Sequence, residues 1–275
     1  MIIDAHQHFW QYDPVKDAWI DETMEVIRKD FFPEHLQPVL EAHGVHGCVA
    51  VQADQSEKET AFLLDLANKH DFIKGVVGWV DLRSHDIQEQ LAHYAQFPLL
   101  KGFRHIVQGE PDPMFLLRDD FCRGILALGQ YDFTYDILVY PKQLPAVVEF
   151  VKKFPNQRLV IDHLAKPDFK SGDIEIWAAQ MREIAASPNV YCKVSGLVTE
   201  ADWNNWEPGH FQPFLDVVLD AFGAHRLMYG SDWPVCLLAA EYGEVKDIVT
   251  NYFSTLSPAE QQKIMGGNAI AFYHL

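Results

Sequence analysis

The sequence predicts an α/β protein whose eight parallel strands close into a (β/α)8 TIM barrel. Strand-like apolar runs alternate with helix-like segments eight times along the chain. These runs are almost uniformly apolar, as expected for parallel strands that are buried on both faces. The 275 residues contain no low-complexity linker and are close to the ~250 residues of one such barrel, so we expect a single domain over residues 1–275.

The strand predictions rest on short apolar runs that are bounded by polar residues, glycine or proline. The first strand begins at Ile2 and leads into His6 and His8. The continuous apolar run 47–53 predicts a fully buried second strand. Six further strands are expected at 73–82, 99–107, 134–139, 158–164, 190–197 and 227–235.

The segments between these runs have helical spacing. In 57–70, for example, Phe62, Leu63 and Leu66 recur on one helical face, and Gly44 ends the helix expected at 33–42. The other helices are expected at 87–97, within 114–129, and at 144–154, 174–186, 211–222, 244–256 and 258–273. The long polar and aromatic connection 11–32 is expected to form a loop beside the functional site.

A doubly wound open sheet is the structural alternative to a barrel. That fold usually carries a glycine-rich fingerprint at its first strand-to-helix turn. Here the corresponding turn carries His6-Gln7-His8 instead. The sequence therefore favours the barrel.

Composition limits the classes of partner. A formal net charge of −17 argues against nucleic acid and anionic membrane surfaces, which both require basic patches. No apolar run approaches the ~18 residues of a membrane span. The four cysteines form no CxxC pair and are expected to be buried, reduced thiols. These features predict a cytoplasmic protein that acts on a small molecule, and they leave open whether it forms a homo-oligomer.

The first strand carries the first candidate site residues. Residues two apart in a strand point to the same side, so His6 and His8 should lie together, as in a metal or proton-transfer site. Because the carboxyl ends of barrel strands converge on one face, polar residues at the other strand ends should join them. Those residues are Gln52, Trp79, Arg104, His105, Tyr140, His163, Asp232 and Trp233, with Lys166, Lys193 and Ser195 also near strand ends. The pattern is typical of a hydrolytic pocket.

Several of these residues also have a structural interpretation. Asp4 is expected to be a structural hydrogen bonder, and Asp162 should point away from the pocket if its neighbour His163 points into it. His105 fits a position in the barrel wall as well as a catalytic one. Asp232 lies where a tight turn leaves the last strand, and we expect it to be catalytic.

Four motifs in order resemble one known family. They are His6-Gln7-His8, Gly102-Phe103-Arg104-His105, Ile161-Asp162-His163-Leu164-Ala165-Lys166-Pro167 and Gly230-Ser231-Asp232-Trp233-Pro234. Together they resemble the amidohydrolase superfamily in its amidohydrolase 2 branch, and within it the sugar-lactonase group of L-fuconolactonase and L-rhamnonolactonase type. The resemblance spans the whole chain, and it implies a distorted barrel that hydrolyses a carbonyl compound.

The resemblance also implies metal ligands. A divalent cation, zinc above all, would be held by His6, His8, His163 and Asp232. The predicted fifth strand ends in Leu138-Val139-Tyr140 and lacks the histidine that many superfamily members have there. A metal-free site in which the histidines act through hydrogen bonds is therefore equally compatible with the sequence, and the metal is expected to be dispensable.

The expected reaction is the opening of a sugar lactone to the aldonic acid. Asp232 would accept a proton from the attacking water as general base. His163, with His6 and His8, would polarise the carbonyl group. The remaining predicted roles are oxyanion or hydroxyl contacts by Arg104 and His105, and sugar binding by Gln52, Trp79, Tyr140 and Trp233.

Three other functions are compatible with parts of the pattern. A pyrone-carboxylate lactone hydrolase would need several pocket arginines, and Arg104 is the evident one. A metal-dependent decarboxylase of the same superfamily would need a fifth-strand histidine. A non-catalytic sugar-binding barrel would keep the aromatic residues and lose the histidines and Asp232.

Overall fold

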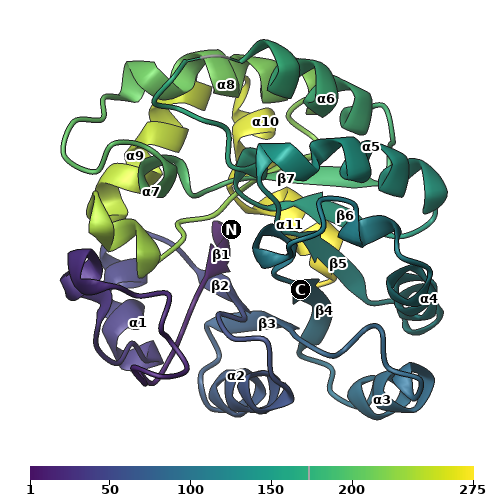
Figure 1. The fold of residues 1–275 in the computed structure, drawn as a ribbon. Helices are drawn as coiled ribbons and strands as arrows, with labels where there is room; N and C mark the ends of the chain where they lie inside the picture. The colour runs from purple at the N-terminus through teal and green to yellow at the C-terminus, as the bar shows by residue number, and fades with distance from the viewer. Residues whose placement is uncertain (173) are drawn as a thin grey trace.

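The computed structural model describes residues 1–172 and 174–275. Its eight strands are all parallel and pair in sequence order. A parallel bridge between Gln7 and Trp233 joins the first strand to the end of the last and closes the barrel. Figure 1 shows the helices arranged around this sheet. The prediction of a (β/α)8 barrel is confirmed.

The strands lie where the sequence predicts them, and they are shorter. They are β1 (Ile3–Gln7), β2 (Gly47–Val51), β3 (Ile73–Gly78), β4 (Leu100–His105), β5 (Thr134–Ile137), β6 (Leu159–Ile161), β7 (Val190–Val194) and β8 (Leu227–Tyr229). The predicted runs also included polar residues at their carboxyl ends. Those residues leave the ladder and form the turns that carry the site, so the apolar pattern overestimates the strand length.

The helices follow the expected alternation. They are α1 (Pro33–Ala42), α2 (Glu57–Lys69), α3 (Ile87–Tyr94), α4 (Asp119–Leu128), α5 (Leu144–Lys153), α6 (Glu175–Ala185), α7 (Leu197–Glu200), α8 (Pro208–Phe222), α9 (Tyr242–Tyr252), α10 (Pro258–Gln262) and α11 (Asn268–Tyr273). Segment 11–32 contains a single short 3-10 helix, Glu22–Ile27, and is otherwise a loop, as expected.

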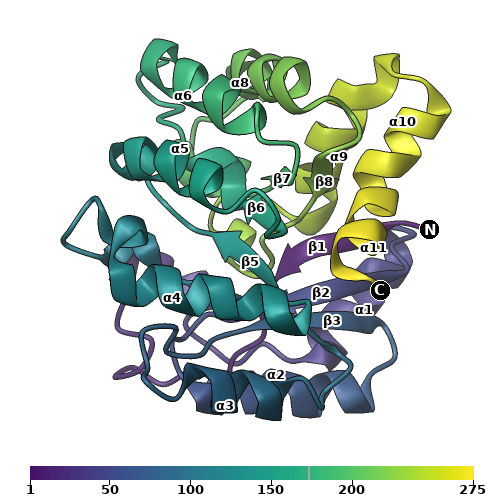
Figure 2. The same ribbon diagram turned by 90° about the vertical axis from the view of Figure 1, so that its right-hand side faces the viewer.

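Two apolar clusters form the core. The larger one fills the space between the strands and the outer helices. The smaller one includes Ile3, Val49 and Val77 from the strands, together with Phe272 and Tyr273 of α11. Figure 2 shows α11 against the strands, close to both termini. The last helix therefore covers the amino-terminal end of the barrel, opposite to the ends where the site residues were predicted.

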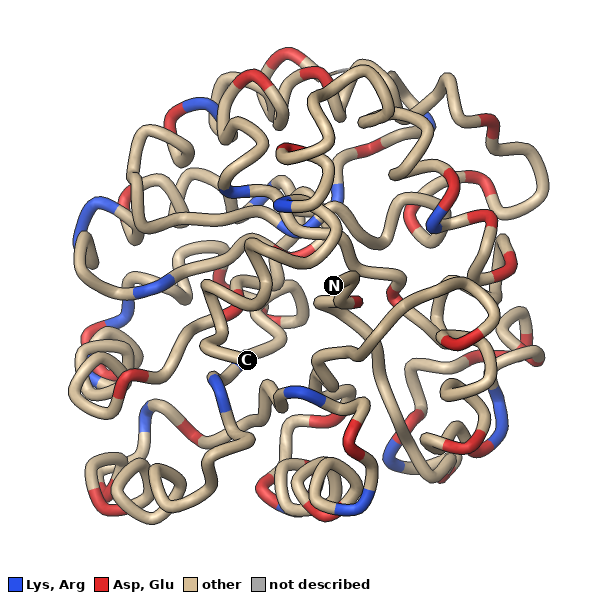
Figure 3. Tube along the Cα trace, turned by 180° about the vertical axis from the view of Figure 1, so that it is seen from behind, with Lys and Arg blue, Asp and Glu red and all other residues tan. Residues whose placement is uncertain are grey.

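The surface and the cysteines agree with the composition. Figure 3 shows acidic and basic residues spread over the outer helices and connections. All four cysteines are buried and free, as predicted. Among the described residues there is no helix with the length and apolar character that crossing a membrane requires.

Candidate active site

His6 and His8 lie side by side at the end of β1, as the sequence predicts. Their Nε2 atoms are 3.2 Å apart, and both side chains are buried. Asp4 is held elsewhere, because its carboxylate accepts hydrogen bonds from the backbone of Ser231 and from the Tyr242 hydroxyl. The pairing of β1 with β2 shifts register between Asp4 and Gln7, and the Asp4 carboxylate also accepts a hydrogen bond from the backbone N–H of His6 over 3.1 Å. Asp4 therefore has the structural role expected of it.

Asp232 follows β8 in a turn that is tied to the end of β1. Its backbone N–H donates to the carbonyl of His6 over 2.8 Å, and that of His8 donates to the carbonyl of Trp233 over 2.7 Å. This places Asp232 Oδ1 3.4 Å from His8 Nε2 and 3.9 Å from His6 Nε2. Thr199 of α7 donates to the other carboxylate oxygen over 3.1 Å. The predicted neighbours from the first and last strands are thus in one place.

His163 joins them from a left-handed turn after β6. Its Nε2 is 3.9 Å from Asp232 Oδ1, and its Nδ1 is 2.8 Å from the Ser195 hydroxyl. Gly196, which has a φ of +66°, allows this close approach, since a Cβ atom there would lie 2.7 Å from His163 Nδ1. Ser195 and Gly196 therefore fix the imidazole from the side of β7.

Arg104 reaches the same place from β4. Its Nη1 donates to Asp162 Oδ2 over 3.0 Å and lies 3.2 Å from His6 Nε2. Its Nη2 donates to Gln52 Oε1 over 3.0 Å and also to the Gln52 backbone carbonyl. Gln52 is fully buried. Its position fits a side chain that orients Arg104, rather than the predicted contact with sugar.

A buried ionic network below this cluster was not predicted from the sequence. Lys193 Nζ lies 2.6 Å from Asp136 Oδ2, 2.9 Å from Asp162 Oδ1 and 3.1 Å from His6 Nδ1. Asp162 was expected to point away from the pocket and instead reaches into the barrel interior, because it continues the alternation of Val160, whose side chain lies in the inner cluster. The left-handed turn that begins at His163 brings the next side chain to the pocket as well. The sequence did contain a signal for Asp136 and Lys193, since each is a charged residue within an otherwise apolar strand.

The pKa values of the His163 imidazole and the Asp232 carboxylate are both shifted by their surroundings. Burial lowers the pKa of the His163 imidazole to about 4, so this ring is neutral at neutral pH. Burial alone would raise the pKa of Asp232, but His163, His8 and His6 outweigh it and bring the pKa below its ordinary value. The site therefore presents an ionised carboxylate next to a neutral imidazole.

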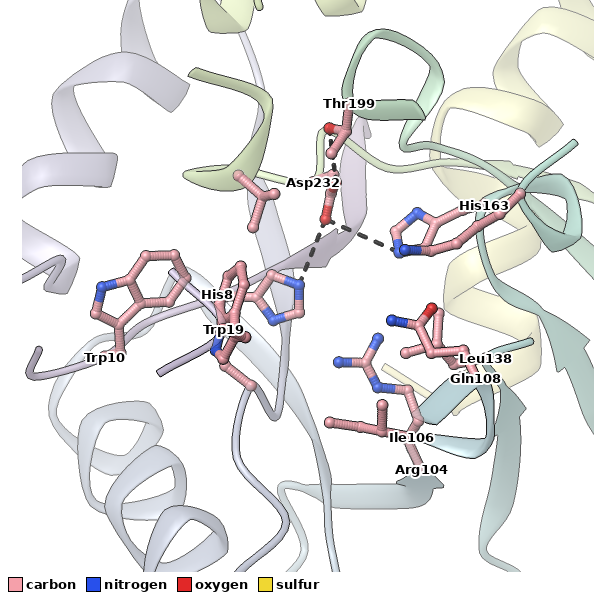
Figure 4. Close-up of a pocket in the computed structure, with 13 residues that line it drawn as sticks. His8, Trp10, Trp19, Arg104, Ile106, Gln108, Leu138, His163, Thr199 and Asp232 are labelled. Atoms are coloured by element: carbon pink, nitrogen blue, oxygen red, sulfur yellow. Dashed lines mark hydrogen bonds and ion pairs between the residues drawn. The ribbon is translucent and has the colours of Figure 1, made fainter. Parts of the chain in front are cut away.

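A pocket of about 240 Å³ opens over this cluster (Figure 4). It is smaller than the roughly 300–1,000 Å³ of pockets for drug-sized ligands, which fits a ligand of monosaccharide size. Its polar lining consists of His8, Arg104, Gln108, His163, Lys166, Thr199 and Asp232. Its apolar lining consists of Trp10, Trp19, Ala53, Ile106, Leu138 and Val235.

His105 is not brought to the pocket, contrary to the predicted catalytic role. Its Nε2 is 2.7 Å from Glu110 Oε1, and its ring stacks on Phe115 with centroids 4.8 Å apart. The reason is strand alternation, because Arg104 faces the barrel interior and the next residue must face the helices. The sequence left both orientations open, and the structure supports the one in the barrel wall.

The predicted aromatic sugar binders also lie outside the pocket lining. Trp79 directs its indole N–H to His105 Nδ1, and Trp233 is 3% exposed and packs against Phe31. Tyr140 is more exposed, and the Lys166 ammonium lies 5.4 Å from its ring centre. Aromatic residues at strand ends were the wrong indicator, because the aromatic lining comes from the first loop.

Four residues of the pocket lining were not predicted from the sequence, namely Trp10, Trp19, Gln108 and Thr199. Trp10 directly follows the paired histidines, and Trp19 lies in the loop predicted to lie beside the site, so both had a signal. No pattern in the sequence points to Thr199, whose position depends on how α7 packs. Lys166 was noted near a strand end, and it lines the pocket while its ammonium pairs with Glu200 Oε1 over 2.7 Å.

The donor atoms fit a divalent cation. His8 Nδ1 lies 2.7 Å from the Val51 carbonyl oxygen, which orients His8 Nε2 toward His6 and Asp232. His6, His8 and Asp232 form one group of converging ligand atoms, and His6, Asp162 and His163 form another. Their spacing is compatible with zinc bonds of about 2.0–2.1 Å. The positive guanidinium of Arg104 next to His6 opposes a cation there and weakens the site.

Comparison with known proteins agrees with these motifs. Residues 3–275 match the amidohydrolase family model. An L-fucono-1,5-lactonase of Burkholderia multivorans is 44% identical over 284 residues, which cover 99% of this chain and 96% of that protein. Another L-fucono-1,5-lactonase, from Burkholderia ambifaria, is 39% identical over 279 residues, with 99% and 95% covered.

A solved structure shares the architecture. The crystal structure of an amidohydrolase from Burkholderia multivorans with bound zinc matches with a TM-score of 0.97 and 44% identity, covering 100% of this chain and 99% of that one. The resemblance seen in the four motifs is thus confirmed over the whole chain. This chain belongs to the amidohydrolase family.

Proposed function

We propose that this protein hydrolyses a sugar lactone of the L-fucono-1,5-lactone kind to the aldonate. The observation that carries the proposal is the 44% identity with an L-fucono-1,5-lactonase over almost the full length of both chains. A pocket of monosaccharide size that contains an ionised carboxylate and a neutral imidazole supports it. A carboxylate can act as general base in the hydrolysis of an activated ester, and an imidazole N–H can stabilise the oxyanion.

Asp232 is the proposed general base. The water oxygen bonds to the lactone carbonyl carbon while one water proton passes to the Asp232 carboxylate. Collapse of the tetrahedral intermediate then breaks the bond between this carbon and the ring oxygen, and Asp232 returns the proton to that oxygen. The carboxylic acid formed ionises and releases one proton to solution. Asp232 is ionised at neutral pH, so its carboxylate can accept the first proton.

The carbonyl oxygen gains negative charge during this attack. His163 and Arg104 both line the pocket and are proposed to stabilise that charge. A divalent cation held by His6, His8 and Asp232, with His163 beside it, would supply Lewis-acid polarisation of the same oxygen. Lys193 and Asp162 hold His6 in place through its Nδ1 side.

Sugar hydroxyl groups need polar partners in the pocket. Gln108 lines it, and its buried Oε1 accepts no hydrogen bond from any described residue. We propose that Gln108 accepts a hydrogen bond from a substrate hydroxyl. Because the Lys166 ammonium lies in the same lining, it is proposed to contact the carboxylate that ring opening creates.

A panel assay with a pH indicator tests the proposed reaction, because each ring opening releases a proton. The panel contains L-fuconolactone, L-rhamnonolactone, a pyrone-dicarboxylate lactone and a dihydroxybenzoate whose decarboxylation is followed by absorbance. We expect the fastest turnover with L-fuconolactone. Turnover of the pyrone or the benzoate alone would contradict the proposal, and so would binding of sugar without any turnover.

The metal requirement is tested separately. We propose that a cation binds without being essential, since Arg104 already places a positive charge beside His6. Elemental analysis before and after chelator treatment should show a divalent metal that can be removed, with lactone hydrolysis largely kept in the verified metal-free protein. Loss of activity that added zinc restores would show that the metal is required.

A further inference from the structure

The aromatic wall of the pocket comes from the loop after β1. Trp19 lines the pocket and is 44% exposed, and its ring meets that of Trp10 edge-on with centroids 6.0 Å apart. Trp10 is buried, and its ring lies 6.5 Å from that of His8. These three rings form a continuous wall that extends from the cluster around Asp232 to the solvent.

This wall faces the polar side of the pocket. Figure 4 shows Trp10, Trp19 and His8 on one side, with His163 and Gln108 on the other. A ligand that bonds to the polar groups must therefore turn its opposite face toward the indole rings. Sugar rings have one or both faces lined by C–H groups, and such a face packs well on an aromatic ring, which is large and apolar.

The exposure of Trp19 is built into the loop. Two residues before it, Asp17 is 2% exposed, and its carboxylate accepts a hydrogen bond from the backbone of Asp13 over 2.8 Å. Directly after it, Ile20 is 3% exposed, and its N–H donates to the Asp17 carbonyl over 2.9 Å. Buried anchors on both sides thus hold the large apolar side chain of Trp19 where it remains partly open to solvent.

Trp10 fixes the inner end of the wall. Its indole N–H donates to the Lys29 carbonyl over 2.9 Å, and its backbone pairs with that of Phe31 on the returning arm of the loop. Trp10 is therefore held in place by the loop and is buried there. Trp19 is the aromatic residue of the wall with substantial surface left for a ligand.

We infer that Trp19 is a substrate-binding residue, the platform on which the C–H face of the sugar ring stacks. This inference rests on the proposed function and deepens it. Trp19 contacts the sugar ring in the bound substrate and in the transition state alike. It therefore contributes to binding, and the chemical step depends on Asp232 and its neighbours.

Kinetics of Trp19→Ala and Trp19→Phe on L-fuconolactone test the inference. Loss of a contact that is equal in ground state and transition state raises KM and leaves kcat unchanged. We expect Trp19→Ala to raise KM about tenfold, the size of an aromatic packing contact, with kcat within about threefold of wild type. Trp19→Phe should recover a large part of the lost affinity because it restores an aromatic face.

The matched control is Val15→Ala, which changes an apolar side chain of the same loop that is 84% exposed and outside the pocket lining. Its KM should equal that of wild type. An unchanged KM in Trp19→Ala would overturn the inference. A fall in kcat alone would also overturn it, as would an equal effect of Val15→Ala, which would indicate general loop damage.

Binding of L-fucose, a cyclic sugar without a lactone bond, followed by titration calorimetry, separates this inference from the proposed function. Wild type should bind this sugar, and Trp19→Ala should bind it about tenfold more weakly. If wild type hydrolyses no lactone, the proposed function fails while the calorimetry still decides on Trp19. Equal affinity of wild type and Trp19→Ala for L-fucose, or no binding by either, would overturn the inference.

Discussion

At the scale of single residues, hydrogen-bond partners decide what each histidine can do. His8 is fixed at Nδ1 by the Val51 carbonyl, which leaves its Nε2 facing Asp232, and His163 is fixed by Ser195. His105 is fixed in the barrel wall, because Trp79 donates to its Nδ1 and leaves Nε2 to donate to Glu110. Equivalent side chains thus have different tasks, set by what surrounds them.

His105 should affect stability rather than catalysis. Burial lowers the pKa of its imidazole below the ordinary value of 6.5, although Glu110 partly opposes this. As the pH falls through about 6.5, the unfolded chain gains a proton that the native state does not take up. This residue therefore stabilises the fold above that pH and loses its contribution as the pH falls.

Urea unfolding of His105→Gln at pH 7.5 and pH 5.5 checks this. The decrease in unfolding free energy between the two conditions should be smaller in the variant than in wild type, and lactone hydrolysis should stay within about threefold, far less than the loss of a general acid or base costs. His85→Gln, at an exposed position, is the control. An unchanged decrease would contradict the proposed stability role, and a large loss of activity would restore the catalytic role first predicted for His105.

Residue chemistry at strand ends was partly predictable from the sequence. The structure brings His6, His8, His163 and Asp232 together, as expected from the convergence of barrel strands and from their motifs. Trp79 and Trp233 were misassigned because position at a strand end does not say whether a side chain faces the pocket or the surrounding helices. That choice is made by local turns, which apolar periodicity does not reveal.

At the scale of elements, one left-handed turn after β6 places both His163 and Lys166 in the pocket lining. His163, Leu164, Ala165 and Lys166 all have φ between +51° and +57°. Left-handed backbone costs non-glycine residues about 1 kcal/mol or more each. Two contacts hold the turn in place. Gly196 packs closely against the His163 ring, and the Trp177 indole donates to the Leu164 carbonyl over 2.9 Å. Tertiary contacts thus override local preference, which explains why the sequence suggested a longer sixth strand.

Gly44 offers a direct measure of that backbone cost. It follows α1 with a φ of +64°, and a Cβ atom there would meet nothing within 4 Å. Gly44→Ala should therefore lower the unfolding free energy by about 1 kcal/mol through backbone strain alone.

Gly209→Ala, in the first turn of α8, is the matched control, because its Cβ would also meet nothing and its φ is not left-handed. Its unfolding free energy should be unchanged or higher by up to about 1 kcal/mol. Chemical denaturation measures the unfolding free energies of both variants and of wild type. Equal effects would mean that the left-handed conformation at Gly44 is not the cause.

At the scale of the whole molecule, the last helix closes the barrel and supports the site from below. Tyr273 of α11 donates to Asp136 Oδ2 over 2.7 Å, and Asp136 pairs with Lys193, which in turn contacts His6. The hydrogen-bond network thus extends from the carboxyl-terminal helix to the site. The sequence predicted the barrel and the final helix from periodicity, but it could not predict this link, which joins residues 137 positions apart.

The variant Tyr273→Phe measures how much the hydrogen bond from Tyr273 to Asp136 contributes to the unfolding free energy. Removing the hydroxyl leaves the buried Asp136 with one donor fewer, which should cost about 1–2 kcal/mol of unfolding free energy. Tyr252→Phe is the control, since it removes an equivalent hydrogen bond to Asp216 at the exposed surface and should cost at most about 0.5 kcal/mol. Thermal and urea denaturation compare the two. Equal losses would show that the buried network does not stabilise the barrel.

Asp232 is the proposed general base on which the hydrolysis of the lactone depends. The most direct test is the rate of L-fuconolactone hydrolysis by Asp232→Asn, with the exposed Asp65→Asn as a charge-matched control. Melting curves and metal content are recorded for both variants, so that unfolding or metal loss is recognised. We expect Asp232→Asn to lose at least about a hundredfold in kcat, as removal of a general base usually does, while Asp65→Asn equals wild type. A folded Asp232→Asn variant that keeps its rate within about tenfold of wild type would contradict the account.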